Sequence, residues 1–167
     1  GGGQSRSSEP TLYERAEAII ETGCSSHYCH GGPGSGAASI NFERVINQGK
    51  PFSAALLSAD GDAVPACEYD RMPLLTPGDA NESWLMVKVE APHDASGQIE
   101  FTPASDWDPG IVADSNGVYP PSACPMTSNG DIVFGLIMPY TAVGPDRLSP
   151  ADIGVIRAWI DAGAPVP

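Results

Sequence analysis

Two cysteines and a histidine lie close together near the start of the chain. Cys24 and Cys29 are separated by four residues, and His30 follows Cys29 directly. In a C-x-x-C-H pattern the two thiols add to the vinyl groups of a haem, and the adjoining histidine becomes an axial ligand of its iron. With the longer spacer, the segment between the thiols must bulge out of a helical turn. The spacing alone is equally compatible with a small disulfide between Cys24 and Cys29, or with no joint role.

A second iron ligand would have to come from elsewhere in the chain. Met138 is followed by a proline and preceded by the apolar residues Leu136 and Ile137. A thioether is a soft ligand that suits haem iron, and the proline would restrain the loop that carries it. The same apolar run is also typical of an ordinary core methionine. The other side chains of suitable chemistry are Met126, Met72 and His93. His27 lies inside the spacer, where we expect it to face solvent.

The two remaining cysteines, Cys67 and Cys124, lie in long segments without clear periodicity. If Cys24 and Cys29 serve a haem, these two would pair and tie the long segments together. Four cysteines in an acidic chain that is rich in glycine and proline also indicate an oxidising compartment.

The first expected helix spans residues 11–22, because its apolar residues recur on one helical face. Thr11 and Glu14 form a capping box at its start, and Gly23 is expected to end it. This helix would therefore deliver Cys24 directly from its C-terminal end.

Three further helices are expected from cap residues and apolar spacing. The first runs from Asn41 to about Gln48 and stops at Gly49. The second runs from Ala80 to about Lys88, after a capping arrangement of Asp79 and Glu82. The last begins at Ser149 and Pro150, with Asp152 completing a capping box, and ends at Gly163 and Pro165.

The helices are separated by two loop insertions, at about 50–77 and 91–135, where prolines interrupt regular structure. Candidate short strands are 99–102 and 132–134, with a β-like tail at 87–90. The acidic residues of the second insertion match no calcium-binding loop and are expected to be turn residues: Asp94, Asp106, Asp108 and Asp114.

The composition limits the organisation of the chain and its partners. Residues 1–10 form a flexible tether by composition, and 11–167 are long enough for a single domain. A net charge of -13 with only eight Lys and Arg residues argues against nucleic acid or an anionic membrane surface as a partner, whereas a basic protein fits. No apolar run approaches the roughly 20 residues of a transmembrane segment. The glycines at the start are compatible with a lipid anchor before Gly1 and equally with a cloning remnant.

Several motifs together resemble the haem-binding cytochrome c-like domains of secreted and lipid-anchored bacterial proteins. They are Cys24 to His30, the run Leu75-Thr76-Pro77-Gly78-Asp79-Ala80-Asn81-Glu82-Ser83-Trp84-Leu85, the dipeptide Met138-Pro139, and the runs 148–153 and 156–165, in this order. The resemblance covers roughly the helical two-thirds of the chain, and its C-terminal motif is more specific than its cysteine motif. The four-residue spacer and the long loop between Glu90 and Met138 depart from the family pattern.

The resemblance implies an all-α, cytochrome c-like helical domain with long loop insertions and a small β-hairpin, in which the first and last helices pack together. It implies one covalently bound haem c, held through thioethers to Cys24 and Cys29. His30 would be the proximal iron ligand and Met138 the distal one.

The implied function is that of an extracytoplasmic monohaem c-type cytochrome, which carries single electrons in the periplasm or at the surface of a bacterium. Its partners would be redox proteins with a basic docking face. With both axial positions filled, no catalytic residue is needed. Two alternatives remain open. One is a haem-free extracellular binding or structural module with disulfides Cys24–Cys29 and Cys67–Cys124, and the other, less favoured, is a peroxidase-like haem enzyme.

Overall fold

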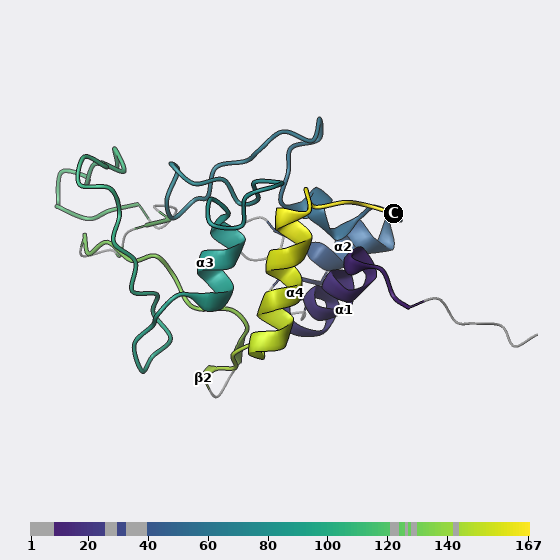
Figure 1. Cartoon of the computed structure of the whole chain (residues 1–167). Helices are drawn as coiled ribbons and strands as arrows, with labels where there is room; N and C mark the ends of the chain where they lie inside the picture. Colours follow the sequence, from purple (N-terminus) through teal and green to yellow (C-terminus); the bar gives the residue numbers. More distant parts are fainter. Residues whose placement is uncertain are drawn as a thin grey trace, which may run out of the picture.

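The computed structural model describes residues 9–25, 30–32, 40–120, 124–125, 127, 130–141 and 144–167. Most of the tether expected at residues 1–10 lies outside these ranges. The elements in chain order are the α-helices α1 (Leu12–Cys24) and α2 (Phe42–Asn47), the 3-10 helix η2 (Phe52–Ala55), α3 (Trp84–Glu90), the strands β1 (Tyr140–Thr141) and β2 (Gly144–Pro145), and α4 (Pro150–Asp161) (Figure 1).

Helix α1 begins at the expected capping box. The backbone N–H of Glu14 donates to the Thr11 hydroxyl at 3.2 Å, and the backbone N–H of Thr11 donates to the Glu14 carboxylate at 2.6 Å. The expected end at Gly23 is wrong, because the helix continues through it to Cys24. A Cβ at Gly23 would lie 3.2 Å from Leu148 and 3.3 Å from Pro139. Gly23 therefore allows α1 to pack closely against the chain that leads into α4.

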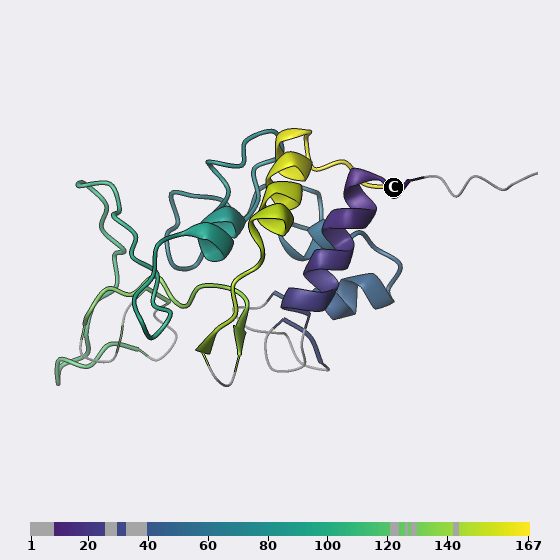
Figure 2. The same cartoon turned by 60° about the horizontal axis from the view of Figure 1, so that its bottom comes forward.

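Helix α4 packs against α1, and the two views in Figures 1 and 2 agree on this arrangement. The Ser149 side chain accepts from the Asp152 backbone N–H, and Pro150 is the first helical residue, as expected. The Trp159 ring contacts Phe52 with a centroid distance of 4.6 Å, and both side chains are fully buried. These contacts place the main hydrophobic core between α1, α4 and η2.

Helix α2 begins where the sequence predicts, whereas α3 begins later than predicted. Asn41 caps α2 as expected, since its side chain accepts from the Arg44 backbone N–H at 2.8 Å. The expected start of α3 at Ala80 is wrong. The Asp79 carboxylate accepts from the backbone N–H groups of Asn81 and Glu82 and so closes a separate turn. Helix α3 begins after this turn, at Trp84. The β-like tail expected at 87–90 is also wrong, because these residues belong to α3.

The strands expected at 99–102 and 132–134 are not formed. Ile99 makes an isolated bridge with His93, and the neighbouring residues Gln98 and Leu136 make another. Left-handed backbone angles at Gly97 and Gly135, with φ of 85° and 76°, interrupt extended pairing there. The β-hairpin lies instead at β1 and β2, which pair antiparallel just after Met138.

The all-α fold class is wrong as an expectation for this protein. The α-helices of the described residues have only 13, 6, 7 and 12 residues, and the loops form a lobe with a core of its own. In Figures 1 and 2 the described part of the loop of residues 91–135 extends from α3 on the side away from α1 and α2, and the loop of residues 50–77 runs from α2 across to α3. The buried apolar side chains of the lobe pack mainly ring against ring: Ala66, Tyr69, Trp84, Ile99, Phe134 and Ile137. Apart from the short 3-10 helix η2, prolines and glycines exclude helices from the described parts of the loops, and aromatic packing takes their place.

None of the described helices combines the length and the apolar composition needed to cross a bilayer.

Candidate functional site

A cavity of about 200 Å³ lies where the end of α1, the start of α2, helix α3 and the segment before β1 meet. Three of the side chains singled out by their chemistry line it, namely Cys24, His30 and Met138. The rest of its lining is Ile40, Phe42, Leu56, Glu68, Leu74, Trp84, Leu85, Lys88, Val89, Gly135 and Leu136. Residues from three distant parts of the chain therefore meet at one cavity.

The side chain of His30 is oriented by its neighbours. His30 is only 8% exposed, and its Nδ1 lies 3.2 Å from the Ile40 backbone carbonyl. A carbonyl oxygen only accepts, so this hydrogen bond places a ring proton on Nδ1, and in the neutral imidazole Nε2 is then the nitrogen with the lone pair. The Phe42 ring packs against the imidazole edge-on, with centroids 5.6 Å apart. A histidine that donates one ring N–H to a backbone carbonyl is typical of metal-ligating histidines.

Cys24 is the last residue of α1 and is buried at 5% exposure. The backbone N–H of His30 donates to the Cys24 carbonyl at 3.3 Å. This hydrogen bond brings His30 back beside the end of α1. Cys29, the second expected thioether residue, lies outside the described residues, as does His27.

Met138 is half-buried and reaches the cavity from the opposite end of the chain. Its backbone N–H donates to the Lys88 carbonyl at 2.6 Å, which attaches the segment before β1 to α3. The rival candidates are placed elsewhere or not described. Met72 packs against the core of the loop lobe, the His93 ring lies 3.3 Å from the Ala91 carbonyl, and Met126 lies outside the described residues.

The cavity wall is largely apolar, and Trp84 is its largest side chain. Trp84 is 1% exposed, and its indole N–H has no hydrogen-bond partner among the described residues. A buried donor without an acceptor costs free energy on the order of 1–3 kcal/mol.

An ion pair that sequence reasoning missed forms part of the same wall. The Lys88 ammonium donates to the Glu68 carboxylate at 3.2 Å, and each side chain is only 13% exposed. Burial lowers the pKa of Lys88, and the Glu68 carboxylate opposes that shift. The one sequence signal was the position of Lys88, four residues after Trp84 and therefore on the same face of α3.

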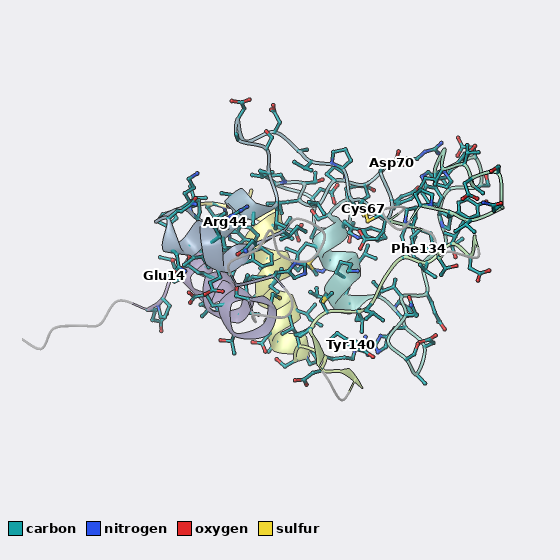
Figure 3. The ribbon with its side chains drawn as sticks, turned by 180° about the vertical axis from the view of Figure 1, so that it is seen from behind. Glu14, Arg44, Cys67, Asp70, Phe134 and Tyr140 are labelled. Carbon is teal, nitrogen blue, oxygen red and sulfur yellow. A yellow bond between two sulfur atoms is a disulfide. The ribbon has the colours of Figure 1, made fainter. Side chains whose placement is uncertain are left out.

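Cys67 and Cys124 form a disulfide with Cα atoms 5.5 Å apart, the pairing expected from the sequence. It joins the loop of residues 50–77 to the loop of residues 91–135. Cys67 directly precedes Glu68, so the disulfide also lies next to the ion pair at the cavity. Figure 3 labels Cys67 and Phe134, which both belong to the loop lobe.

Asp94, Asp108 and Asp114 hold turns, as expected, whereas the Asp106 carboxylate pairs with Arg71 at 2.6 Å. The carboxylate of Asp94 accepts from the backbone N–H groups of Ser96 and Gln98, and that of Asp114 accepts from those of Asn116 and Val118. The Ser96 hydroxyl is the main cause of the lowered pKa of Asp94. The described part of the chain contains no group of three or more His, Cys, Asp or Glu side chains placed to hold a metal ion.

No family of known proteins, no curated protein and no solved structure matches this chain. Its function therefore has to be argued from the cavity itself.

The residues around the cavity fit a haem. His30 and Met138 supply an imidazole and a thioether, Cys24 supplies a thiol, and the apolar side chains match the face of a macrocycle. The cavity is smaller than the roughly 300–1,000 Å³ that is usual for ligand sites. A haem would therefore extend beyond its walls or move them apart.

Proposed function

We propose that this protein is a monohaem c-type electron carrier that works outside the cytoplasm. The observation that carries the proposal is the single cavity to which Cys24, His30 and Met138 all contribute. These are the side-chain types that tether a haem and ligate its iron on both faces. Cys29, which directly precedes His30, would supply the second thioether.

The residues of the chain would hold the cofactor and define its environment. A bound haem supplies the one-electron oxidation and reduction of its iron. His30 would ligate through Nε2, because its Nδ1–H is engaged with the Ile40 carbonyl. Met138 would ligate through its sulfur on the other face. With both positions occupied by protein, no substrate would reach the iron, so we expect electron transfer and no catalysis.

The apolar side chains at the cavity would set the direction of the redox potential. Phe42, Trp84 and Val89 are buried and would exclude water from the ring. Exclusion of water favours the ferrous state, whose iron–porphyrin core is neutral, over the positively charged ferric state. Methionine ligation acts in the same direction, so we expect a potential toward the oxidising end of an electron-transfer chain.

Two observations support the proposed location and partner. The Cys67–Cys124 disulfide is typical of an oxidising compartment such as the periplasm or the cell exterior. The net charge of -13 favours a redox partner with a basic docking face, bound in a weak encounter that salt weakens further.

The decisive experiment is the mass of the denatured protein after expression together with a c-type haem attachment system. We expect the mass of the polypeptide plus one haem after acid–organic extraction, because thioether bonds survive that treatment. A Cys24→Ser, Cys29→Ser variant should lose the covalent haem. A Cys67→Ser, Cys124→Ser variant is the matched control and should keep it. A wild-type mass equal to that of the polypeptide alone would refute the proposal.

The second candidate function is a haem-free extracellular binding or structural module. The Cys67–Cys124 disulfide favours it as well, because such modules are often held by disulfides. This reading requires Cys24 and Cys29 to pair with each other. An absorption spectrum without haem bands after expression with the attachment system would establish it over the first proposal.

A further inference from the structure

The segment from Phe134 to Met138 is attached to Lys88 at both of its ends. The Met138 backbone N–H donates to the Lys88 carbonyl at 2.6 Å, and the Lys88 ammonium lies 3.4 Å from the Phe134 carbonyl. Between these points the Ile137 backbone N–H also donates to the Gly97 carbonyl at 2.8 Å, which attaches the segment to the turn around Gly97. One residue of α3 therefore spans the segment that brings Met138 to the cavity.

The Lys88 ammonium group is largely removed from water, which costs desolvation free energy that an exposed lysine does not incur. A lysine on an amphipathic helix usually extends its charged end into water. Here the Lys88 side chain is only 13% exposed, and the Glu68 carboxylate at 3.2 Å compensates its charge. The neighbouring disulfide of Cys67 holds Glu68 within the loop lobe. The buried pair is thus fixed from the lobe as well as from α3.

Gly135 provides the space that this arrangement needs. A Cβ at Gly135 would lie 2.8 Å from the Lys88 Nζ and 3.3 Å from the Glu68 carboxylate. The backbone of Gly135 also has a φ of 76°, which glycine adopts without strain. A side chain at this position would be strained at this φ and would require the Lys88 ammonium or the segment to move, so the contact between them would be disturbed.

We propose that Lys88, fixed by Glu68, is a positioning residue that holds the Phe134–Met138 segment so that the Met138 sulfur faces the cavity. The inference rests on the proposed function, because the sulfur is assigned there as the distal iron ligand. Lys88 itself does not touch the iron. Removing its ammonium should free one end of the segment while the backbone bond from Met138 to Lys88 remains possible.

The test uses the haem-containing protein with Lys88→Leu and Glu68→Gln combined, because Lys88→Leu alone leaves a buried carboxylate without a partner, and leucine adds no second thioether at the cavity. Residues that do not bind the metal themselves but orient one of its ligands typically contribute roughly ten- to hundredfold to metal affinity or activity. Carbon monoxide competes with Met138 for the same iron position. The double variant should therefore bind carbon monoxide about ten- to hundredfold more tightly and lose much of the sulfur-to-iron charge-transfer band.

Two comparisons make the result specific. Arg71→Met with Asp106→Asn removes an exposed ion pair of the same kind and should change neither readout. Gly135→Ala should act in the same direction as the double variant, since it disturbs the contact between the segment and the Lys88 ammonium and leaves both charges in place. An unchanged band and unchanged carbon monoxide affinity in the double variant, with haem attached, would overturn the role of Lys88 and leave the proposed function standing. A wild-type protein without haem would overturn both.

Discussion

Removal of the Cys67–Cys124 disulfide is the perturbation whose effect follows most directly from the structure. The bridge closes a loop of 57 residues, which corresponds to about 4 kcal/mol of unfolding free energy at 25 °C in the chain-entropy model. Cys67 is exposed, so Cys67→Ser with Cys124→Ser should remove little buried surface. The entropic contribution should therefore dominate the loss.

Urea unfolding followed by far-ultraviolet circular dichroism measures this loss. For the usual dependence of roughly 1–3 kcal/mol per molar urea, the midpoint of the variant should fall by more than about 1 M. The wild type in a thiol reductant should unfold at the same midpoint as the variant. A midpoint change below about 0.3 M would refute the argument that the bridge restrains the unfolded chain.

The same samples separate the two candidate functions by counting thiols. Thioether bonds to haem resist thiol reductants, whereas disulfides do not. Unfolded and reduced wild type should release two thiols if Cys24 and Cys29 carry a haem. The haem-free module would release all four.

The remaining predictions concern the ligand, a turn and a helix contact. Met138→Ala should keep the haem attached, lose the sulfur-to-iron charge-transfer band, and lower the redox potential by about 60 mV for each tenfold preference of the sulfur for ferrous iron. Redox titration measures the shift, and a retained band would assign the ligand to another residue. Asp94→Asn should lower the urea midpoint at pH 6, because the pKa of Asp94 is depressed in the folded state below its unfolded value near 3.8. This stabilisation is lost as the pH falls through the folded pKa, so the midpoints of variant and wild type should converge well below pH 3.8. An equal difference at both pH values would contradict this. Gly23→Ala should give a lower urea midpoint than Gly154→Ala, since both substitutions gain helix propensity, but only the Cβ at Gly23 would crowd Leu148 and Pro139, whereas a Cβ at Gly154 meets nothing within 4 Å.

The helix starts at Thr11, Asn41 and Ser149 could be predicted from the sequence because a cap depends on hydrogen bonds within about three residues. The same reasoning placed α3 too early, at Asp79. That carboxylate was free to close a turn of its own, and the helix start moved to Trp84. Local patterns indicate which groups are able to cap, while the surrounding packing decides which of them do.

The fold class was predicted wrongly because the loops could not be assigned a structure from periodicity. Their prolines and glycines correctly excluded α-helices from the described residues of these loops, although residues 52–55 form a 3-10 turn. What remained hidden was that rings such as Tyr69, Trp84 and Phe134 pack into a second core. Ring packing joins residues far apart in the chain, and no short-range spacing encodes it.

The sequence by itself determined the chemistry available to this protein, namely two clustered cysteines with a histidine, several thioethers and a second pair of cysteines. Only the tertiary structure decided that Met138, and neither Met72 nor His93, lines the cavity with His30. The pairing of Lys88 with Glu68 was likewise decided there, across 20 residues of chain. Side-chain types are local properties, whereas burial and proximity depend on how distant segments pack, which is why the candidate ligands could be predicted and the cavity could not.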